Sequence, residues 1–216
     1  MGVFKELLKE KPLLGQEKQT GLLGELLFLE RIIELKGENA IHAWGGPYDE
    51  PHDFRLDNLE FEVKSTLTTK RVHTIHGVGQ LVPNEGCELY LFSVMLGPAG
   101  GSKGFTLPEK ADHLESRLSK TQSTKDRFLT ALKQVGLKKD DYLHYNTRYS
   151  LRRPFAIAPV DQSFPAITRP TIQNSLGPLA NRIDSLQYQV DIEGLEKEED
   201  TPEFSAVLPN PDLNNE

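Results

Sequence analysis

The chain has 216 residues, of which 37% are hydrophobic and 26% charged, so it is long enough to bury one core without disulfides or metals. Its single cysteine, Cys87, excludes an intramolecular disulfide and fits a reducing compartment. No apolar run reaches the roughly 20 residues that a membrane-spanning helix needs. We therefore expect a cytoplasmic protein with no membrane partner.

The formal net charge of −7 is unevenly distributed. From Asp191 to the end of the chain, nine acidic residues stand against one lysine, Lys197, so the rest of the chain is nearly neutral. A neutral body permits a local basic patch for nucleic acid but does not predict one. The acid-rich segment 196–216 predicts a disordered tail after a domain of residues 1–195. Masking of a basic groove by this tail is the alternative interpretation.

The first predicted element is a helix over residues 20–36, which Thr20 can cap and Gly37 can end. Apolar residues repeat within it at helical spacing, at Leu22, Leu26, Leu29 and Ile33. Short β-like pieces follow at residues 40–44, 52–56 and 60–66, the first two separated by a turn through Gly45-Gly46-Pro47.

The continuous apolar run 88–96 predicts a strand buried on both faces. Two helices are expected after it, over residues 110–120 and 124–135, the second with Ser123 as a cap and Gly136 at its end. Residues 149–160 are β-like, and the clean alternation of residues 186–192 predicts a half-buried strand. This order of elements predicts a single mixed α/β domain.

The segment of residues 60–66 carries the residues of greatest chemical interest. In a strand its apolar side chains point to the core, while Glu62 and Lys64 lie next to each other on the opposite face. Asp53 precedes Glu62 by nine residues, a separation that a hairpin-like return can close. Two carboxylates and one lysine can therefore meet at the end of a strand pair.

Such a set suits the hydrolysis of a phosphodiester. Two carboxylates can hold Mg²⁺, which prefers oxygen ligands and keeps several waters, and Mn²⁺ is the expected substitute. A lysine at the same edge can orient the nucleophile or offset negative charge on the phosphate. We therefore assign Asp53 and Glu62 as metal ligands and Lys64 as the positioning cation.

These residues also resemble a known motif. His52-Asp53-Phe54 followed by Glu62-Val63-Lys64 resembles the PD-(D/E)XK motif of restriction-endonuclease-like nucleases, with Asp53, Glu62 and Lys64 at its defining positions. The chain departs from the motif in having His52 where proline is usual, with Pro51 one place earlier. The resemblance implies a restriction-endonuclease-like α/β core, in which helices flank a mixed sheet, and magnesium-dependent cutting of DNA.

The helix over residues 20–36, with Gly24-Glu25-Leu26-Leu27, resembles the first helix of this fold, which often supplies an acid to the metal site. The resemblance therefore implies Glu25 as a third metal ligand. On a helical wheel Glu25 lies within the apolar arc, where an acid is costly unless it is paired. The alternative is that Glu25 lies at the margin of this arc and reaches water.

More closely, the chain resembles a family of bacterial PD-(D/E)XK motif proteins over roughly residues 10–195. The shared blocks are the Gly24-Glu25-Leu26-Leu27 helix, residues 52–66, Gln80-Leu81, Phe164-Pro165 and residues 187–191. This resemblance implies a setting among restriction and anti-phage genes, with a helicase or methyltransferase as a further partner.

Residues 64–76 contain no acid and follow the catalytic strand directly, so they are candidates for gripping DNA. The candidate contacts are Ser65, Lys70, Arg71, His73 and His76, together with Gln80, which the resemblance places at the site. The alternative is an ordinary solvated loop.

Two other functional interpretations remain. A non-catalytic DNA-binding or assembly subunit on the same fold would suit the near-neutral body. Alternatively, Glu60, Glu62 and Lys64 form only a solvated strand face with an exposed ion pair, which contributes little energy. If the chain cuts both strands of DNA with one such site each, a homodimer is favoured.

Overall fold

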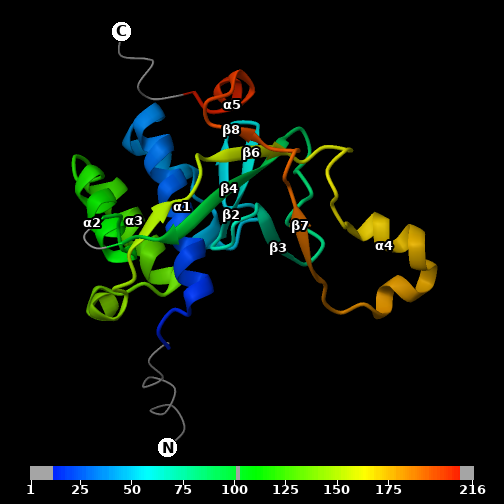
Figure 1. Cartoon of the computed structure of the whole chain (residues 1–216), viewed down its shortest axis with the longest axis horizontal. Helices are drawn as coiled ribbons and strands as arrows, with labels where there is room; N and C mark the ends of the chain where they lie inside the picture. Colours follow the sequence, from blue (N-terminus) through cyan, green and yellow to red (C-terminus); the bar gives the residue numbers. More distant parts are fainter. Residues whose placement is uncertain (1–11, 101–102, 210–216) are drawn as a thin grey trace, which may run out of the picture.

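Strand β4 (Glu88–Pro98) is the centre of a six-stranded sheet in the computed structural model, which describes residues 12–100 and 103–209 (Figure 1). It pairs in parallel with β2 (Leu59–Thr66) and antiparallel with both β5 (Tyr149–Leu151) and β6 (Ala156–Pro159). Side chains on both faces of β4 are buried, which confirms the prediction of a strand enclosed on two sides.

The two ends of the sheet are short strands. β1 (Phe54–Leu56) pairs antiparallel with β2, and β8 (Lys197–Glu198) pairs antiparallel with β6. The sheet is therefore mixed, as the α/β prediction requires. The predicted strand at residues 60–66 is confirmed as β2, and its register with β1 places Phe54 opposite Phe61.

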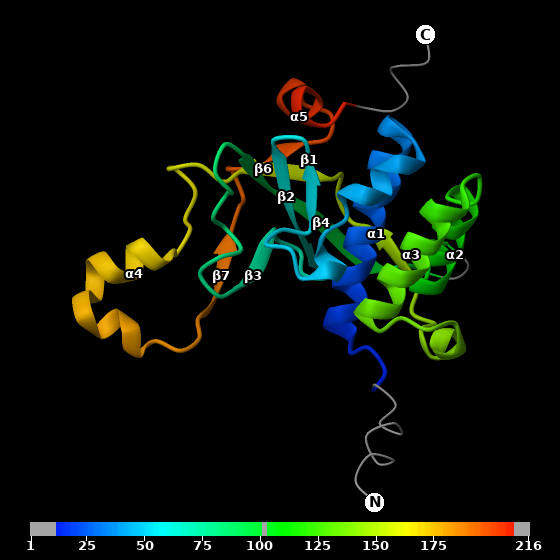
Figure 2. The ribbon, with the colours of Figure 1, turned by 180° about the vertical axis from the view of Figure 1, so that it is seen from behind.

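Helices cover one face of this sheet (Figures 1 and 2). α1 (Gln16–Lys36) packs on β2, and α2 (Leu107–Arg117) packs on α1. α3 (Gln122–Val135) lies against two short 3₁₀ segments, η1 (Glu38–Ala43) and η2 (Gly46–Tyr48). The ring of Phe28 from α1 lies at the middle of this core, with centroid distances of 4.6, 4.9 and 4.6 Å to Phe54, Phe61 and Phe92.

A two-stranded ribbon covers the other face. β3 (Val72–His76) and β7 (Gln187–Asp191) pair antiparallel and confirm the alternation predicted for residues 186–192. Their inward side chains form a second apolar cluster with residues of β4, β6 and the adjoining loops. Its buried members are Ile75, Leu81, Leu91, Ala158, Phe164, Val190 and Ile192. The remaining elements are η3 (Lys139–His144), α4 (Arg169–Leu176), η4 (Gly177–Arg182) and α5 (Pro202–Val207).

Several predicted boundaries and one predicted strand are wrong. α1 begins four residues before Thr20, whose hydroxyl bonds back to carbonyls of the first turn, although Gly37 ends the helix as predicted. Thr121 rather than Ser123 precedes α3. Residues 40–43 belong to η1 rather than to a strand, and only Trp44 makes a single bridge, to Phe54.

The prediction of a disordered tail is wrong for residues 196–209. β8 extends the sheet, and Phe204 of α5 is completely buried in the main core. Acidic side chains of this segment pair with arginines of the body, Glu199 with Arg31 and Glu198 with Arg71 and Arg153. The segment therefore belongs to the domain, because its acids meet partners that lie far away in the sequence.

Residues 210–216 of the predicted tail and the first eleven residues of the predicted domain lie outside the described part. None of the helices within that part is long and apolar enough to cross a membrane.

Candidate active site

The edge of β2 loses its partner strand just where the candidate residues begin. β1 ends its pairing with Phe54 opposite Phe61, so extending the register by one place sets Asp53 opposite Glu62. The side chain of Asp53 here replaces a backbone partner on β1, because its Oδ2 accepts a hydrogen bond from the Val63 N–H at 2.8 Å. The hairpin-like return predicted from the spacing therefore brings Asp53 to β2.

The turn that precedes β1 holds Asp53 from the other side. The N–H groups of Gly45 and Gly46 both donate to the Asp53 carbonyl, at 2.9 and 3.1 Å. A β-carbon at Gly46 would lie 3.0 Å from Asp53 Oδ1 and 3.3 Å from Glu25 Oε2. A side chain at position 46 would therefore be crowded by two carboxylates.

Glu25 reaches this point from α1. It is half-buried, and its Oε2 accepts a hydrogen bond of 2.7 Å from the indole N–H of Trp44. Burial raises the pKa of Glu25 to about 7, because the Trp44 hydrogen bond offsets only part of the desolvation and the Glu62 charge adds to it. The resemblance implied that Glu25 lies at the site, and the hydrogen bond from Trp44 holds its carboxylate there, beside Asp53.

The pKa of Asp53 is raised for the same reasons as that of Glu25. Burial raises its pKa well above the ordinary value, and the negative charges of Glu62 and Glu25 raise it further, against the opposing effects of Lys64 and the Val63 N–H. The negative charge of Glu62 thus disfavours ionisation of both Glu25 and Asp53, and a cation between the carboxylates would relieve this repulsion.

Lys64 is held between an acid and an amide. Its Nζ lies 2.8 Å from Glu62 Oε1 and donates to Gln80 Oε1 at 3.1 Å. The same Gln80 oxygen accepts from the His76 N–H at 2.8 Å. Glu62 and Lys64 therefore point to one side of β2, as the strand alternation predicted, and Glu62 is only 2% exposed, which is inconsistent with a solvated strand face.

His52, where the chain departs from the motif, is buried beneath the acids of β2. Its Nε2 lies 3.0 Å from the Val82 carbonyl and 3.4 Å from Glu60 Oε2, and its Nδ1 lies 3.7 Å from Glu62 Oε2. Burial alone would lower the pKa of His52, but the Glu62 and Glu60 carboxylates raise it above the ordinary value. A proline at this position could make none of these contacts.

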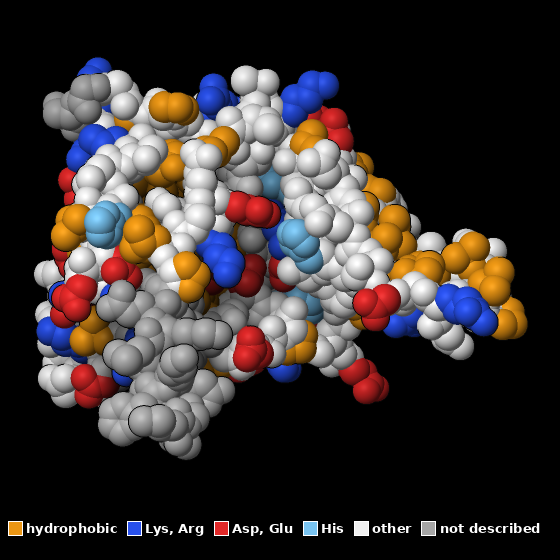
Figure 3. Space-filling model, turned by 90° about the horizontal axis from the view of Figure 1, so that it is seen from below, with side chains coloured by type: hydrophobic (Ala, Val, Ile, Leu, Met, Phe, Trp, Pro, Cys, Tyr) orange, Lys and Arg blue, Asp and Glu red, His pale blue; other side chains and the backbone are white. Residues whose placement is uncertain are grey.

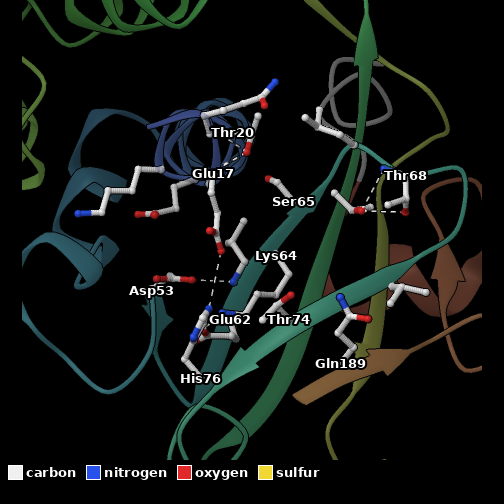
Figure 4. Close-up of a pocket in the computed structure, with 18 of the residues that line it drawn as sticks. Glu17, Thr20, Asp53, Glu62, Lys64, Ser65, Thr68, Thr74, His76 and Gln189 are labelled. Carbon is white, nitrogen blue, oxygen red and sulfur yellow. Dashed lines mark hydrogen bonds and ion pairs between the residues drawn. The ribbon is translucent and has the colours of Figure 1, made fainter. Parts of the chain in front are cut away.

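Glu25, Asp53, Glu62 and Lys64 all line one groove of about 1020 Å³. Figure 3 shows acidic, basic and histidine side chains side by side on this face. In Figure 4, Asp53 and Glu62 lie close to Lys64, with Glu17 and Thr20 of α1 on one side and Thr74, His76 and Gln189 of the ribbon on the other. The groove thus runs between the first helix and the β3–β7 ribbon.

The predicted DNA contacts divide into two groups. Lys70, His76 and Gln80 line the groove and stay candidates. Ser65 also lines it, but its Oγ is buried against Gly24 and has no hydrogen-bond partner in the described part of the chain.

The prediction that Arg71 and His73 contact DNA is wrong, because their side chains are buried, with exposed fractions of 0% and 1%. Arg71 donates to Ser93, to the Pro154 carbonyl and to Glu198. His73 Nε2 lies 2.8 Å from Ser93 Oγ, and burial lowers the pKa of this histidine to about 3. Both side chains therefore hold β3 to the sheet.

Whether the acids suit a divalent cation depends on their chemistry and spacing. Their oxygens are the donors that Mg²⁺ and Mn²⁺ accept. Among the described residues, however, no three His, Cys, Asp or Glu side chains are already gathered as a metal-binding group. Because Mg²⁺ is usually held by one or two carboxylates and keeps several waters, the pair Asp53 and Glu62 meets its needs without a third ligand.

Trp44 and His52 contact the acids of the site, and the sequence pattern did not reveal these contacts. Trp44 stacks on Phe54 with a centroid distance of 6.2 Å. Its bond to Glu25 has no sequence signature, because the two residues come from separate elements. The replacement of proline by His52 was the one available signal.

A sequence model of one protein family, described as "Putative PD-(D/E)XK family member, (DUF4420)", matches residues 2–193. No curated protein and no solved structure gives a match. The match covers almost the whole chain, including the helix of Glu25, the Asp53 hairpin and the β3–β7 ribbon. It confirms the predicted restriction-endonuclease-like α/β fold.

Proposed function

Because the chain belongs to this PD-(D/E)XK family, we propose that it is a magnesium-dependent endonuclease that hydrolyses phosphodiester bonds in DNA. The observation that carries the proposal is the meeting of Asp53, Glu62 and Lys64 at one unpaired strand edge inside a groove. Chance surface acids would be solvated and would have ordinary pKa values, whereas burial raises the pKa of Asp53 well above its usual range.

Asp53 and Glu62 would hold the metal, with Glu25 as a third ligand. When bound, a divalent cation lowers the pKa of water and offsets negative charge on the phosphate. The carboxylates must be ionised to bind it, so the raised pKa values of Asp53 and Glu25 predict that metal binding releases protons.

Lys64 is the residue of the chain that can act directly at the phosphate. Its ammonium is half-buried and is fixed in place by Glu62 and Gln80. A fixed positive charge beside the phosphate stabilises the charge that develops during attack, and it needs no reorganisation as the reaction proceeds. Lys70 and His76 on the rim of the groove are placed to contact the neighbouring backbone phosphates.

The test is the cutting of plasmid DNA by the purified chain in Mg²⁺, in Mn²⁺ and in EDTA. We expect Asp53→Asn and Lys64→Ala to lower the rate by at least 100-fold while the fold is retained. Asp57→Asn is the matched control, because Asp57 lies in the same hairpin, is exposed and has a left-handed backbone that asparagine tolerates. Cutting that persists in Asp53→Asn would show that another site is responsible.

A non-catalytic DNA-binding subunit is the second candidate, favoured by the absence of a preassembled three-ligand group among the described residues. It predicts DNA binding of equal strength with and without metal, and no cutting at any Mg²⁺ or Mn²⁺ concentration.

Restriction or phage defence is the proposed setting for either function, with a helicase or methyltransferase as the proposed partner. A homodimer is proposed for double-strand cutting, and light scattering with and without DNA tests it.

A further inference from the structure

We infer that α4 and η4, residues 169–182, form an arm that holds duplex DNA beside the groove, an inference that rests on the proposed function. The arm projects from the body in both ribbon views (Figures 1 and 2). α4 packs mainly against η4. Within the arm only Ile172 and Ala180 are buried, so the element contributes little to the core.

The side chains of the arm carry a net positive charge. Residues 162–183 contain Arg169 and Arg182 and no acid, although the chain has 32 acidic residues in all. Both arginines are exposed, and no ion pair involving either is found in the described part. An isolated basic element on an acidic protein has the charge that a phosphate backbone requires.

Several other exposed side chains of the arm are of the kind that bind DNA backbones. They are hydroxyls and amides, at Thr171, Gln173, Asn174, Ser175 and Asn181. Such groups donate hydrogen bonds to phosphate and sugar oxygens. The arm therefore combines charge with several short-range donors on one small projection.

The arm also lies next to the groove of the candidate active site. A second hollow of about 350 Å³ separates the arm from the β3–β7 ribbon and is lined by Arg169, Ile172 and Asp184. His76 lines both this hollow and the main groove. A duplex whose backbone enters the groove at Lys64 can thus pass His76 and reach the arm.

Two exposed leucines, Leu176 at 44% and Leu179 at 61%, favour a different occupant, namely a second copy of the chain. Figure 3 shows hydrophobic and basic side chains together on the projection. Two side chains supply much less apolar area than the roughly 800 Å² per partner of a stable interface. The basic and amide-rich surface therefore favours DNA.

The test is the affinity of the full chain for a fluorescent 30-base-pair duplex, measured by anisotropy in EDTA at several salt concentrations. Arg169→Glu with Arg182→Glu is compared with Lys133→Glu plus Lys138→Glu. Both lysines are exposed and lie in or just after α3, on the opposite side of the body from the arm. The two variants change the net charge equally, so they separate a local contact from general repulsion.

We expect the arm variant to bind at least tenfold more weakly and to lower the salt slope by about two, because two phosphate contacts are lost. The control variant should stay within about threefold of the unmodified chain. Arg169→Gln with Arg182→Gln should weaken binding in the same direction, and circular dichroism checks the fold of each variant. Equal affinity in the arm and control variants overturns the inference.

Plasmid cutting distinguishes this inference from the proposed function. If the unmodified chain cuts DNA and the arm variant binds normally, the inference fails and the nuclease stands. If the arm variant loses binding in a chain that never cuts, the inference stands and the nuclease fails. A chain that binds no duplex contradicts both. If Leu176→Ser with Leu179→Ser turns a dimer into a monomer while the arginine changes leave DNA affinity intact, the arm is a self-association surface.

Discussion

Trp44 connects the core to the groove through a single hydrogen bond. Its ring is fully buried between Phe54 and Phe128, and its N–H holds Glu25 at 2.7 Å. Because Trp44 is the only tryptophan of the chain, its emission reports on the carboxylate that it touches. Glu25 is thereby kept beside Asp53 even though the pKa of each is raised by burial.

Binding of Mg²⁺ or Ca²⁺ should therefore change the fluorescence of Trp44, because a cation beside Glu25 withdraws charge from the hydrogen bond. We expect a saturable change in emission, reversed by EDTA. Glu25→Gln should reduce its amplitude by at least half. Glu30→Gln on the same helix is the control, since Glu30 pairs with Lys110 and does not line the groove. The same response in both variants would place the cation elsewhere.

The raised pKa of Glu25 also predicts a pH dependence of stability. The folded chain holds the Glu25 proton up to about pH 7, whereas the unfolded chain releases it near 4.5. The folded state therefore binds more protons between these values, and the free energy of unfolding falls as the pH rises from about 4.5 to about 7. The contribution of this one group is on the order of 3 kcal/mol.

Urea unfolding in EDTA at pH 5 and pH 8 measures this effect. Because other groups titrate as well, the quantity to compare is the difference between the chain and Glu25→Gln. The variant should lose less stability at pH 8, and Mg²⁺ should restore more stability in the unmodified chain than in the variant, which keeps Asp53 and Glu62 as ligands. Identical pH profiles for the two would rule out a buried, high-pKa Glu25.

At the scale of elements, the close packing of α1 on β2 depends on one glycine. A β-carbon at Gly24 would lie 2.0 Å from Ser65 Oγ and 3.4 Å from Val63 Cγ1. The side chains of α1 therefore come near to β2, and Glu25, one residue later, reaches the groove. This contact gives a physical reason for the glycine in the Gly24-Glu25-Leu26-Leu27 block.

Gly24→Ala should destabilise the fold by about 1–3 kcal/mol through overpacking. Gly21→Ala is the matched control, because Gly21 is in the same helix with nothing within 4 Å of an added β-carbon, and alanine there should stabilise by about 0.5–1 kcal/mol. Chemical denaturation measures both. Ser65→Ala in the Gly24→Ala background should recover part of the loss. Equal effects of the two glycine changes would show that the helix and strand are not in contact.

The elements that the sequence predicted are those whose pattern is local. Period-two alternation predicted that Glu62 and Lys64 share a face of β2, and a continuous apolar run predicted β4. α4 was not expected, because it buries little and so has no apolar stripe. η1 was taken for a strand because six residues in a 3₁₀ turn leave no periodic signal.

Residues whose role depends on distant partners were the harder ones to assign. Arg71 is basic and lies shortly after β2, so DNA contact was the natural interpretation. Its position is decided by Ser93, Pro154 and Glu198, which lie far along the chain. Likewise, nothing near Glu25 in the sequence indicated its bond to Trp44.

At the scale of the whole molecule, the C-terminal acids neutralise arginines of the body. Glu199 pairs with Arg31 of α1, and Glu198 pairs with Arg71, next to β3, and with Arg153, next to β6. The separation of a neutral body from an acidic tail in the sequence therefore does not persist in the fold. It also leaves the groove without a masking acidic segment from residues 196–209.

The strongest test of this arrangement is Phe204 in α5. Its ring is fully buried, lies 6.4 Å from the Phe92 ring and faces the Arg31 guanidinium at 4.9 Å. Phe204→Ala should lower the free energy of unfolding by about 3–5 kcal/mol, because it removes a large core side chain and opens a cavity beside a buried cation. Glu203→Ala, at the exposed neighbouring position, should change it by no more than about 0.5 kcal/mol. Urea denaturation followed by circular dichroism measures both values. If the tail is disordered, both changes should have the same small effect. If α5 is ordered, the effects must differ strongly, because Phe204 lies in the core that supports β2 and the groove, whereas Glu203 does not.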